Sequence, residues 1–150
     1  MGRLSGAIPV GAVVALDTSA FIYYVEASPT YGEVLRPFFA ALARGEFRAV
    51  TSIITLMELV VQPLRVEAPH VADEYEMLLL NYPNLTTIGI DRFVARRAAE
   101  LRARFRLRPA DSLQLATALE SGAATFVTND RTLSKVTGLE VLQIDSFIER

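Results

Sequence analysis

The sequence contains no cysteine, no tryptophan and a single histidine among its 150 residues. Without cysteine, disulfide bonds and thiolate-bound metals are excluded. Mechanisms that need a pair of histidines are excluded too. His70 follows Pro69 at the start of an acidic amphipathic stretch, where we expect a surface residue rather than a catalytic one. No run of about 18 apolar residues occurs, so we expect no membrane-spanning segment.

The composition is that of an ordinary globular protein, with 51% hydrophobic and 21% charged residues. We expect a single domain over residues 1–150, in which residues 1–11 form a leader before the first strand. Gly6 and Pro9 interrupt this leader, which makes it a poor match to a secretory signal. We therefore expect a cytoplasmic protein.

Positive charge comes almost entirely from arginine, because Lys135 is the only lysine. The net charge is −2, yet residues 92–108 contain seven arginines and one acidic residue, Glu100, which leaves a charge of +6 there and −8 elsewhere. A basic segment in an otherwise acidic chain is typical of a nucleic-acid contact. Glu100 can also pair with arginines four residues away on both sides, which is typical of a solvated helix face.

The apolar run over residues 13–16 ends abruptly at Asp17, Thr18 and Ser19. Such a run with β-branched residues is typical of a strand covered on both faces, as in the centre of a parallel α/β sheet. These sheets bind ligands beyond the carboxyl ends of their strands, so Asp17 would face the ligand crevice. A helix N-cap explains the same residue types equally well.

Strand-like and helix-like segments alternate along the rest of the chain, which predicts a parallel sheet covered on both faces. We expect further strands over residues 47–50, 85–90, 124–127 and 141–144. We expect helices over residues 18–26, 31–43, 66–81, 91–105 and 110–121, and one from a Thr51-Ser52 cap to about residue 61, just before Pro63.

Four acidic residues follow these strands or have apolar surroundings. Asp17 and Asp130 each come directly after a strand-like run and belong at the carboxyl edge of the sheet. Glu58 lies in a helix that is apolar on most sides, which predicts burial and a partner or metal for its charge. Asp111 follows Pro109 in a first helical turn, where the helix dipole favours a negative charge even if the residue has no functional role. Asp130, considered alone, is an ordinary turn residue.

Carboxylates that gather at one edge need a counter-charge. Two unit charges 4 Å apart repel by about 1 kcal/mol in water and about 4 kcal/mol at an effective dielectric constant of ~20. A divalent cation removes this repulsion, and oxygen ligands favour Mg²⁺ or Mn²⁺ over zinc. Such a site is suited to phosphodiester hydrolysis.

Four segments together resemble the successive motifs of PIN-domain ribonucleases, in particular the VapC-like toxins. They are residues 16–19 (LDTS), 51–59 (TSIITLMEL), 108–118 (RPADSLQLATA) and 126–130 (FVTND). The resemblance covers nearly the whole chain after residue 11. It implies a three-layer α/β/α fold with a central parallel sheet of about five strands in the order 3-2-1-4-5.

The resemblance also implies a metal-dependent endoribonuclease, the toxin of a type II toxin–antitoxin pair, with one or two Mg²⁺ or Mn²⁺ ions. Its partners would be RNA, a second copy of the chain in a homodimer, and a small antitoxin whose tail blocks the acidic cleft. Carried over by motif, the catalytic and metal-binding acids would be Asp17, Glu58, Asp111 and Asp130, with Ser19 and Thr128 as supporting hydroxyls.

Arg106 and Arg108 are poorly compensated by nearby acids and lead directly to Asp111, so they are our candidates for contacts with RNA phosphates. Three alternatives remain. Loss of an acid would favour a non-catalytic PIN-like scaffold for RNA or protein, and all four acids are present. A haloacid-dehalogenase-like phosphatase needs a second aspartate two residues after Asp17, where Ser19 stands. A receiver-type phosphoacceptor would be labelled by acetyl phosphate.

Overall fold

The computed structural model describes residues 3–148. In this part of the chain, five strands form one all-parallel sheet in the order β3-β2-β1-β4-β5, which confirms the predicted order and places β1 at the centre. The strands are β1 (Val13–Leu16), β2 (Arg48–Ser52), β3 (Leu85–Ile88), β4 (Thr125–Thr128) and β5 (Glu140–Gln143).

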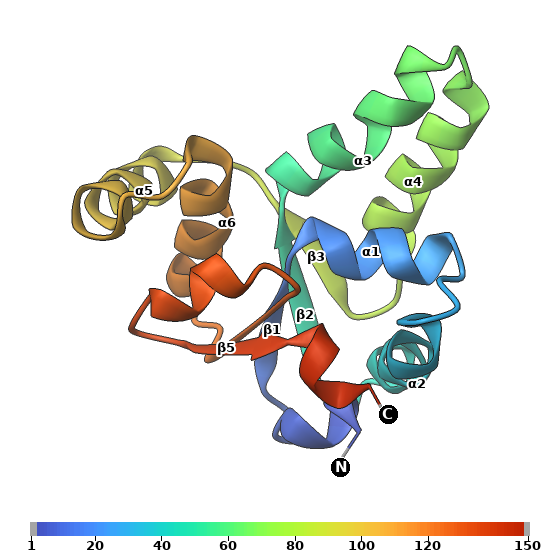
Figure 1. Cartoon of the computed structure of the whole chain (residues 1–150), viewed down its shortest axis with the longest axis horizontal. Coiled ribbons are helices and arrows are strands. Elements are labelled where there is room, and N and C mark those ends of the chain that lie inside the picture. The colour runs from blue at the N-terminus through green and yellow to red at the C-terminus, as the bar shows by residue number, and fades with distance from the viewer. Residues whose placement is uncertain (1–2, 149–150) are drawn as a thin grey trace.

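Helices cover both faces of this sheet, so the predicted three-layer α/β/α fold is confirmed. Figure 1 shows α1 to α4 on one side of the strands and α5 with α6 on the other. The α-helices are α1 (Thr18–Val25), α2 (Gly32–Ala43), α3 (Ile53–Arg65), α4 (Pro69–Asn81), α5 (Arg92–Phe105) and α6 (Pro109–Glu120). Short 3-10 helices are η1 (Leu4–Ala7), η2 (Arg131–Lys135) and η3 (Ile144–Phe147).

The two faces of β1 serve two separate hydrophobic cores, because successive side chains of a strand point to opposite sides. Val14 and Leu16 belong to the larger core beneath α1 to α4, whereas Ala15 belongs to the smaller core beneath α5 and α6. The larger core also takes in the segment before the first strand. Leu4 and Ile8 are buried there, so residues 4–8 pack against the domain.

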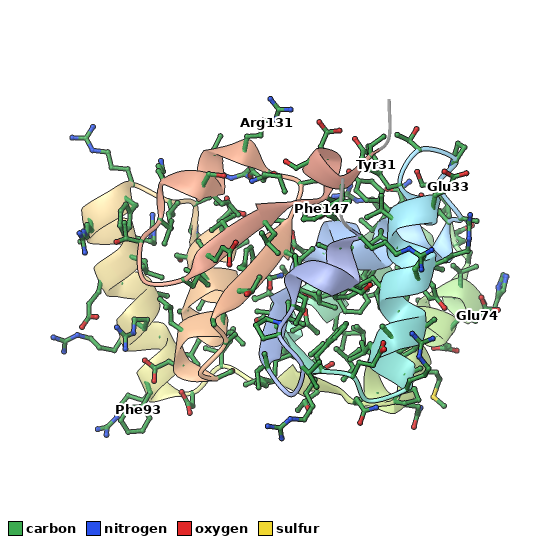
Figure 2. All side chains as sticks on the ribbon, turned by 90° about the horizontal axis from the view of Figure 1, so that it is seen from below. Tyr31, Glu33, Glu74, Phe93, Arg131 and Phe147 are labelled. Carbon is green, nitrogen blue, oxygen red and sulfur yellow. The ribbon has the colours of Figure 1, made fainter. Side chains whose placement is uncertain are left out.

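Helix α5 carries its apolar and basic residues on different sides. Val94, Ala98 and Leu101 are buried, as their spacing predicts, while Phe93 at the start of the helix is 61% exposed and projects outward (Figure 2). On the opposite layer, His70 is exposed in the first turn of α4, as expected for a surface residue. None of the helices in residues 3–148 is long and apolar enough to cross a membrane.

Helix α3 differs from the sequence prediction in two ways. It continues to Arg65 instead of ending near residue 61, so Pro63 lies inside its last turn, although proline has no backbone N–H to donate there. It is also not largely buried. One face packs on the core through Leu59, while an apolar stripe on the opposite face is exposed: Ile53, Met57, Val61 and Leu64.

Candidate acidic site

The carboxyl ends of three neighbouring strands bring the functional segments together. β1 pairs with β2 on one side and with β4 on the other, all parallel, so Asp17, Ser52 and Thr128 lie at the same edge of the sheet. The backbone amide of Asp17 donates to the carbonyl of Val127 at 2.9 Å, which fixes the end of β1 against β4. The strand topology therefore sets where the first acid lies.

Asp17 is at once a helix cap and the central acid of this edge. Its Oδ1 accepts from the amide of Thr18 at 2.8 Å, and its Oδ2 accepts from the hydroxyl of Thr128 at 2.6 Å. Burial raises the pKa of Asp17; the hydrogen bonds from Thr128 and Thr18 oppose this shift, and the charges of Glu58 and Asp111 add to it. The pKa is raised overall, so burial and the two neighbouring acids outweigh the two hydrogen bonds.

Glu58 reaches the same edge from α3, through a buried polar network. Its Oε1 accepts from the hydroxyl of Thr18 at 2.8 Å and from Nε2 of Gln114 at 3.2 Å. The same Gln114 nitrogen donates to the hydroxyl of Thr55 at 2.9 Å, and Thr55 shares a hydrogen bond of 2.7 Å with Thr51. These contacts hold the carboxylate of Glu58 toward α1 and α6.

The sequence patterns did not predict the contact of Thr18 with Glu58, and they did not indicate a role for Thr55 or Gln114. A signal was available for Gln114, because it stands between Leu113 and Leu115 in an otherwise apolar stretch of the sequence. In the structure its side chain is 3% exposed. A buried polar side chain needs a partner, so a glutamine at a core position indicates a network. Which residues form that network could not be known from the sequence.

Asp111 and Asp130 are linked by one arginine. Nε of Arg108 donates to Oδ2 of Asp111 at 2.9 Å, and Nη2 of Arg108 lies 3.7 Å from Oδ2 of Asp130. The hydrogen bond and charge of Asp111 raise the pKa of Arg108. Asp130 also caps η2, since its Oδ1 accepts from the amide and hydroxyl of Thr132 at 2.9 and 2.7 Å.

The remaining predicted residues lie at different distances from this group. Thr128 contacts Asp17 directly, whereas Oγ of Ser19 is buried and has no hydrogen-bond partner within residues 3–148. Arg106 ends α5 in the left-handed conformation, with φ 54°, and is exposed. Thus the four acids, Thr128 and Arg108 share one edge, and Arg106 lies beside it in the chain.

The chemistry of the donors fits a hard divalent cation. Asp17, Glu58, Asp111 and Asp130 offer only oxygen atoms, and Ser19, two residues after Asp17, has a buried hydroxyl with no hydrogen-bond partner among residues 3–148. Their present spacing is looser than a closed metal centre: within the described part of the chain, no three or more acidic or histidine side chains are grouped closely enough to hold an ion. Arg108 forms ion pairs with two of these acids, Asp111 and Asp130.

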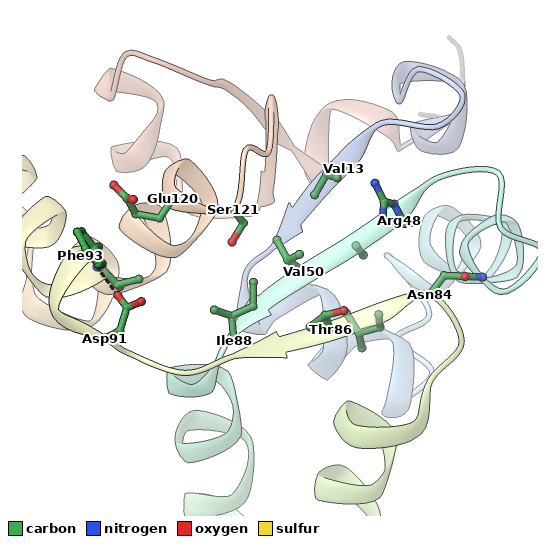
Figure 3. Close-up of a pocket in the computed structure, with 13 residues that line it drawn as sticks. Val13, Arg48, Val50, Asn84, Thr86, Ile88, Asp91, Phe93, Glu120 and Ser121 are labelled. Carbon is green, nitrogen blue, oxygen red and sulfur yellow. Dashed lines mark hydrogen bonds between the residues drawn. The ribbon is translucent and has the colours of Figure 1, made fainter.

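A groove on the sheet lies away from these acids. The groove has a volume of about 690 Å³ and lies on the face of β1, β2 and β3 that α5 and α6 leave uncovered. Figure 3 shows Arg48 toward one end and Asp91 and Glu120 toward the other. None of the four acids lines it. This groove is therefore not part of the acidic site.

Solved structures with the same fold include toxin–antitoxin complexes. VapBC2 from Rickettsia felis bound to a promoter DNA fragment is 19% identical, with 87% of this chain and 98% of that chain covered and a TM-score of 0.71. DNA-bound VapBC from Salmonella typhimurium is 22% identical, with 89% and 98% covered and a TM-score of 0.69.

A third similar structure is the Mycobacterium tuberculosis toxin VapC20, described as cleaving the sarcin-ricin loop. It is 14% identical, with 85% of this chain and 98% of that chain covered and a TM-score of 0.64. No curated protein matches the sequence. The PIN domain family model matches residues 14–139. These residues include all four acids and the carboxyl ends of β1, β2 and β4. The chain belongs to the PIN-domain family.

Proposed function

We propose that this protein is a metal-dependent endoribonuclease that hydrolyses RNA phosphodiester bonds, and that it is the toxin of a type II toxin–antitoxin pair. The observation that carries the proposal is that Asp17, Glu58, Asp111 and Asp130 lie along one sheet edge of a PIN-domain chain, close enough for their charges to interact with Asp17 or Arg108. The solved toxins of the same fold support the same assignment.

One or two Mg²⁺ or Mn²⁺ ions would be held by Asp17 and Asp111, with Glu58 and Asp130 completing the site. When bound, such an ion acidifies the attacking water and stabilises the charge that develops on the phosphate. The protein's own contribution is positional. Thr128 orients Asp17, and Gln114 with Thr18 orients Glu58.

A carboxylate of this group can take the proton from the attacking water, and in-line attack would leave a 5′-phosphate and a 3′-hydroxyl. Arg106 and Arg108 are the proposed contacts to RNA phosphates. Within α5, Arg97 pairs with Glu120 at 2.9 Å and Arg96 pairs with Glu100 at 3.5 Å.

The proposal is tested by cleavage of end-labelled structured RNAs in Mg²⁺, Mn²⁺ or EDTA. We expect cleavage that requires the metal and falls at least about a hundredfold in Asp111→Asn, because removal of a metal ligand costs more than the ten- to hundredfold typical of a second-sphere change. Asp73→Asn, an equivalent change at an exposed position of α4, should retain full activity.

Two outcomes would contradict it. Equal activity in the wild type and in Asp111→Asn would trace the cleavage to a contaminant. If the folded protein with metal cuts none of a broad panel of RNAs, the non-catalytic scaffold becomes the better interpretation.

We further propose that the protein forms a homodimer through the exposed apolar stripe on α3, and that a small antitoxin covers the acidic edge. Figure 1 shows α3 and α4 side by side, extending away from the sheet. Met57 and Leu64 are each 54% exposed on this stripe. Apolar surface gathered along one helix face is typical of a protein interface.

Met57→Glu is therefore expected to convert a dimer to a monomer, measured as molar mass by light scattering after size exclusion. A charge at the centre of an apolar interface would be buried without a partner. Gln62→Glu adds the same charge to an exposed position outside the stripe and should stay dimeric. A wild type of monomer mass, or a dimeric Met57→Glu, would place the interface elsewhere.

A further inference from the structure

Arg108 holds an unusual position in the acidic site, because it is a cation already placed between two of the acids. Its guanidinium donates to Asp111 at 2.9 Å and lies 3.7 Å from Asp130. The side chain of Arg108 is 77% exposed, whereas those of Asp111 and Asp130 are 20% and 31% exposed. The arginine thus covers its two partners from the solvent side.

The local sequence explains this placement. Pro109 follows Arg108 and restricts it to an extended backbone, with φ −65° and ψ 153°, while Pro109 itself starts α6. Asp111 is in the first turn of the same helix, three residues after Arg108. The side chain of Arg108 therefore folds over the helix start toward Asp111, and the loop after β4 brings Asp130 to the other side.

Arg108 and a divalent cation would compete for the same carboxylate oxygen atoms. The guanidinium uses Oδ2 of Asp111 and faces Oδ2 of Asp130, and a cation bound by these acids would need the same oxygen atoms. Two positive charges cannot both lie against one carboxylate pair without repulsion. Because Arg108 is exposed, its departure into solvent requires no movement of the backbone.

We propose that Arg108 is an exchangeable counter-ion of the acidic site: it neutralises Asp111 and Asp130, a divalent cation displaces it, and the released guanidinium then contacts the RNA phosphate. This inference rests on the proposed function, since it takes the four acids as the metal site. It adds a coupling between metal and substrate. Metal binding frees the arginine for the phosphate, so RNA should bind more tightly once the metal is bound.

The first measurement is Mn²⁺ binding to the whole protein without RNA, followed by electron paramagnetic resonance. We expect Arg108→Gln to lower the Kd for Mn²⁺ by about two- to fivefold, the range that an exposed ion pair supports. Arg106→Gln removes the same charge two residues away, outside the contacts with Asp111 and Asp130, and should change the Kd less. Asp111→Asn should weaken binding.

The second measurement follows the exchange directly. The Nε–H resonance of Arg108, identified by its loss in Arg108→Gln, should shift as Mg²⁺ is added, because the hydrogen bond to Asp111 is broken. The resonance of Arg106 should not shift in this way.

The outcomes distinguish failure of the arginine exchange from failure of the metal site. If Arg108→Gln and the wild type bind Mn²⁺ equally, or if Arg106→Gln has the same effect, the exchange is wrong while the metal site stands. A resonance of Arg108 that does not change when Mg²⁺ saturates the site would also overturn the exchange. If neither the wild type nor Arg108→Gln binds Mn²⁺, the metal site itself fails, and the exchange with it.

Discussion

Asp17→Asn is expected to lose RNA cleavage by at least about a hundredfold while the protein stays folded. Both hydrogen bonds of the carboxylate survive in the amide: Oδ1 can still accept from Thr18, and Nδ2 can donate to the hydroxyl of Thr128. The cap is kept because asparagine caps helices as well as aspartate does. Only the negative charge is lost, so loss of cleavage would identify the charge as the functional property.

The same variant has a signature in stability. Burial raises the pKa of Asp17 above 3.8, so the folded protein binds its proton more tightly than the unfolded chain does. Below pH 3.8 both states are protonated and there is no penalty. As the pH rises through 3.8 to the folded pKa, ionisation destabilises the wild type, and the penalty is complete above that pKa.

We therefore expect the free energy of unfolding of Asp17→Asn minus that of the wild type to grow with pH over this window and then stay constant. Urea denaturation between pH 3.5 and 7, without metal, measures the difference, in which groups common to both proteins cancel. Added Mg²⁺ should stabilise the wild type and not the variant, because a ligand stabilises only the protein that binds it.

The matched control is Asp91→Asn. Asp91 is also an N-cap, whose side chain accepts from the amide of Val94 at 2.9 Å, but it lies at the start of α5 away from the acids. It should keep both cleavage and stability. A fully active Asp17→Asn protein would show that Asp17 is only a cap and would remove the central acid from the proposed site.

Phe39→Ala is expected to destabilise the fold by about 3–5 kcal/mol, the usual cost of emptying a buried aromatic site. The side chain of Phe39 is completely buried in the larger core. Its ring stacks on that of Tyr24 with a centroid distance of 4.1 Å and packs edge-to-face with that of Phe21 at 5.7 Å. Phe39 therefore anchors α1, which contains both partners. Since α1 starts at Thr18, loosening this contact would also disturb the acid that precedes it.

Chemical denaturation measures the effect, and Phe93→Ala is its control. Phe93 is 61% exposed at the outer end of α5, so we expect a change of about 0.5 kcal/mol or less. If the two variants are equally stable, Phe39 is not the anchor of α1. If Phe39→Ala does not fold at all, Phe39→Leu, which fills most of the volume, should recover folded protein.

Local patterns in the sequence determined much of this fold. The apolar run over residues 13–16 is a central strand, and Val94, Ala98 and Leu101 form the buried side of α5. Periodicity and strand ends are properties of neighbouring residues, so they can be read directly. They also placed Asp17 and Asp130 at the carboxyl edge, because each follows its strand at once.

Hydrophobic periodicity did not predict which apolar side chains of α3 are exposed. The apolar helix α3 exposes Met57 and Leu64, because an apolar side chain looks the same in sequence whether the core or another protein covers it. The burial of Leu4 and Ile8 was likewise not predicted. Their fate depends on the core beneath α2 and η3, which is assembled from distant parts of the chain.

The contacts that shape the acidic site were decided by tertiary structure alone. Thr18 meets Glu58 across 40 residues, and Gln114 meets Thr18 across 96. Arg108, which precedes α6, joins Asp111 in the first turn of that helix to Asp130 in the loop after β4. The sequence by itself determined which acids are available and which strands carry them. Only packing of the two layers against the sheet decided which hydroxyl, amide or guanidinium each acid would meet, because those partners are distant in the chain and interact only in the folded structure.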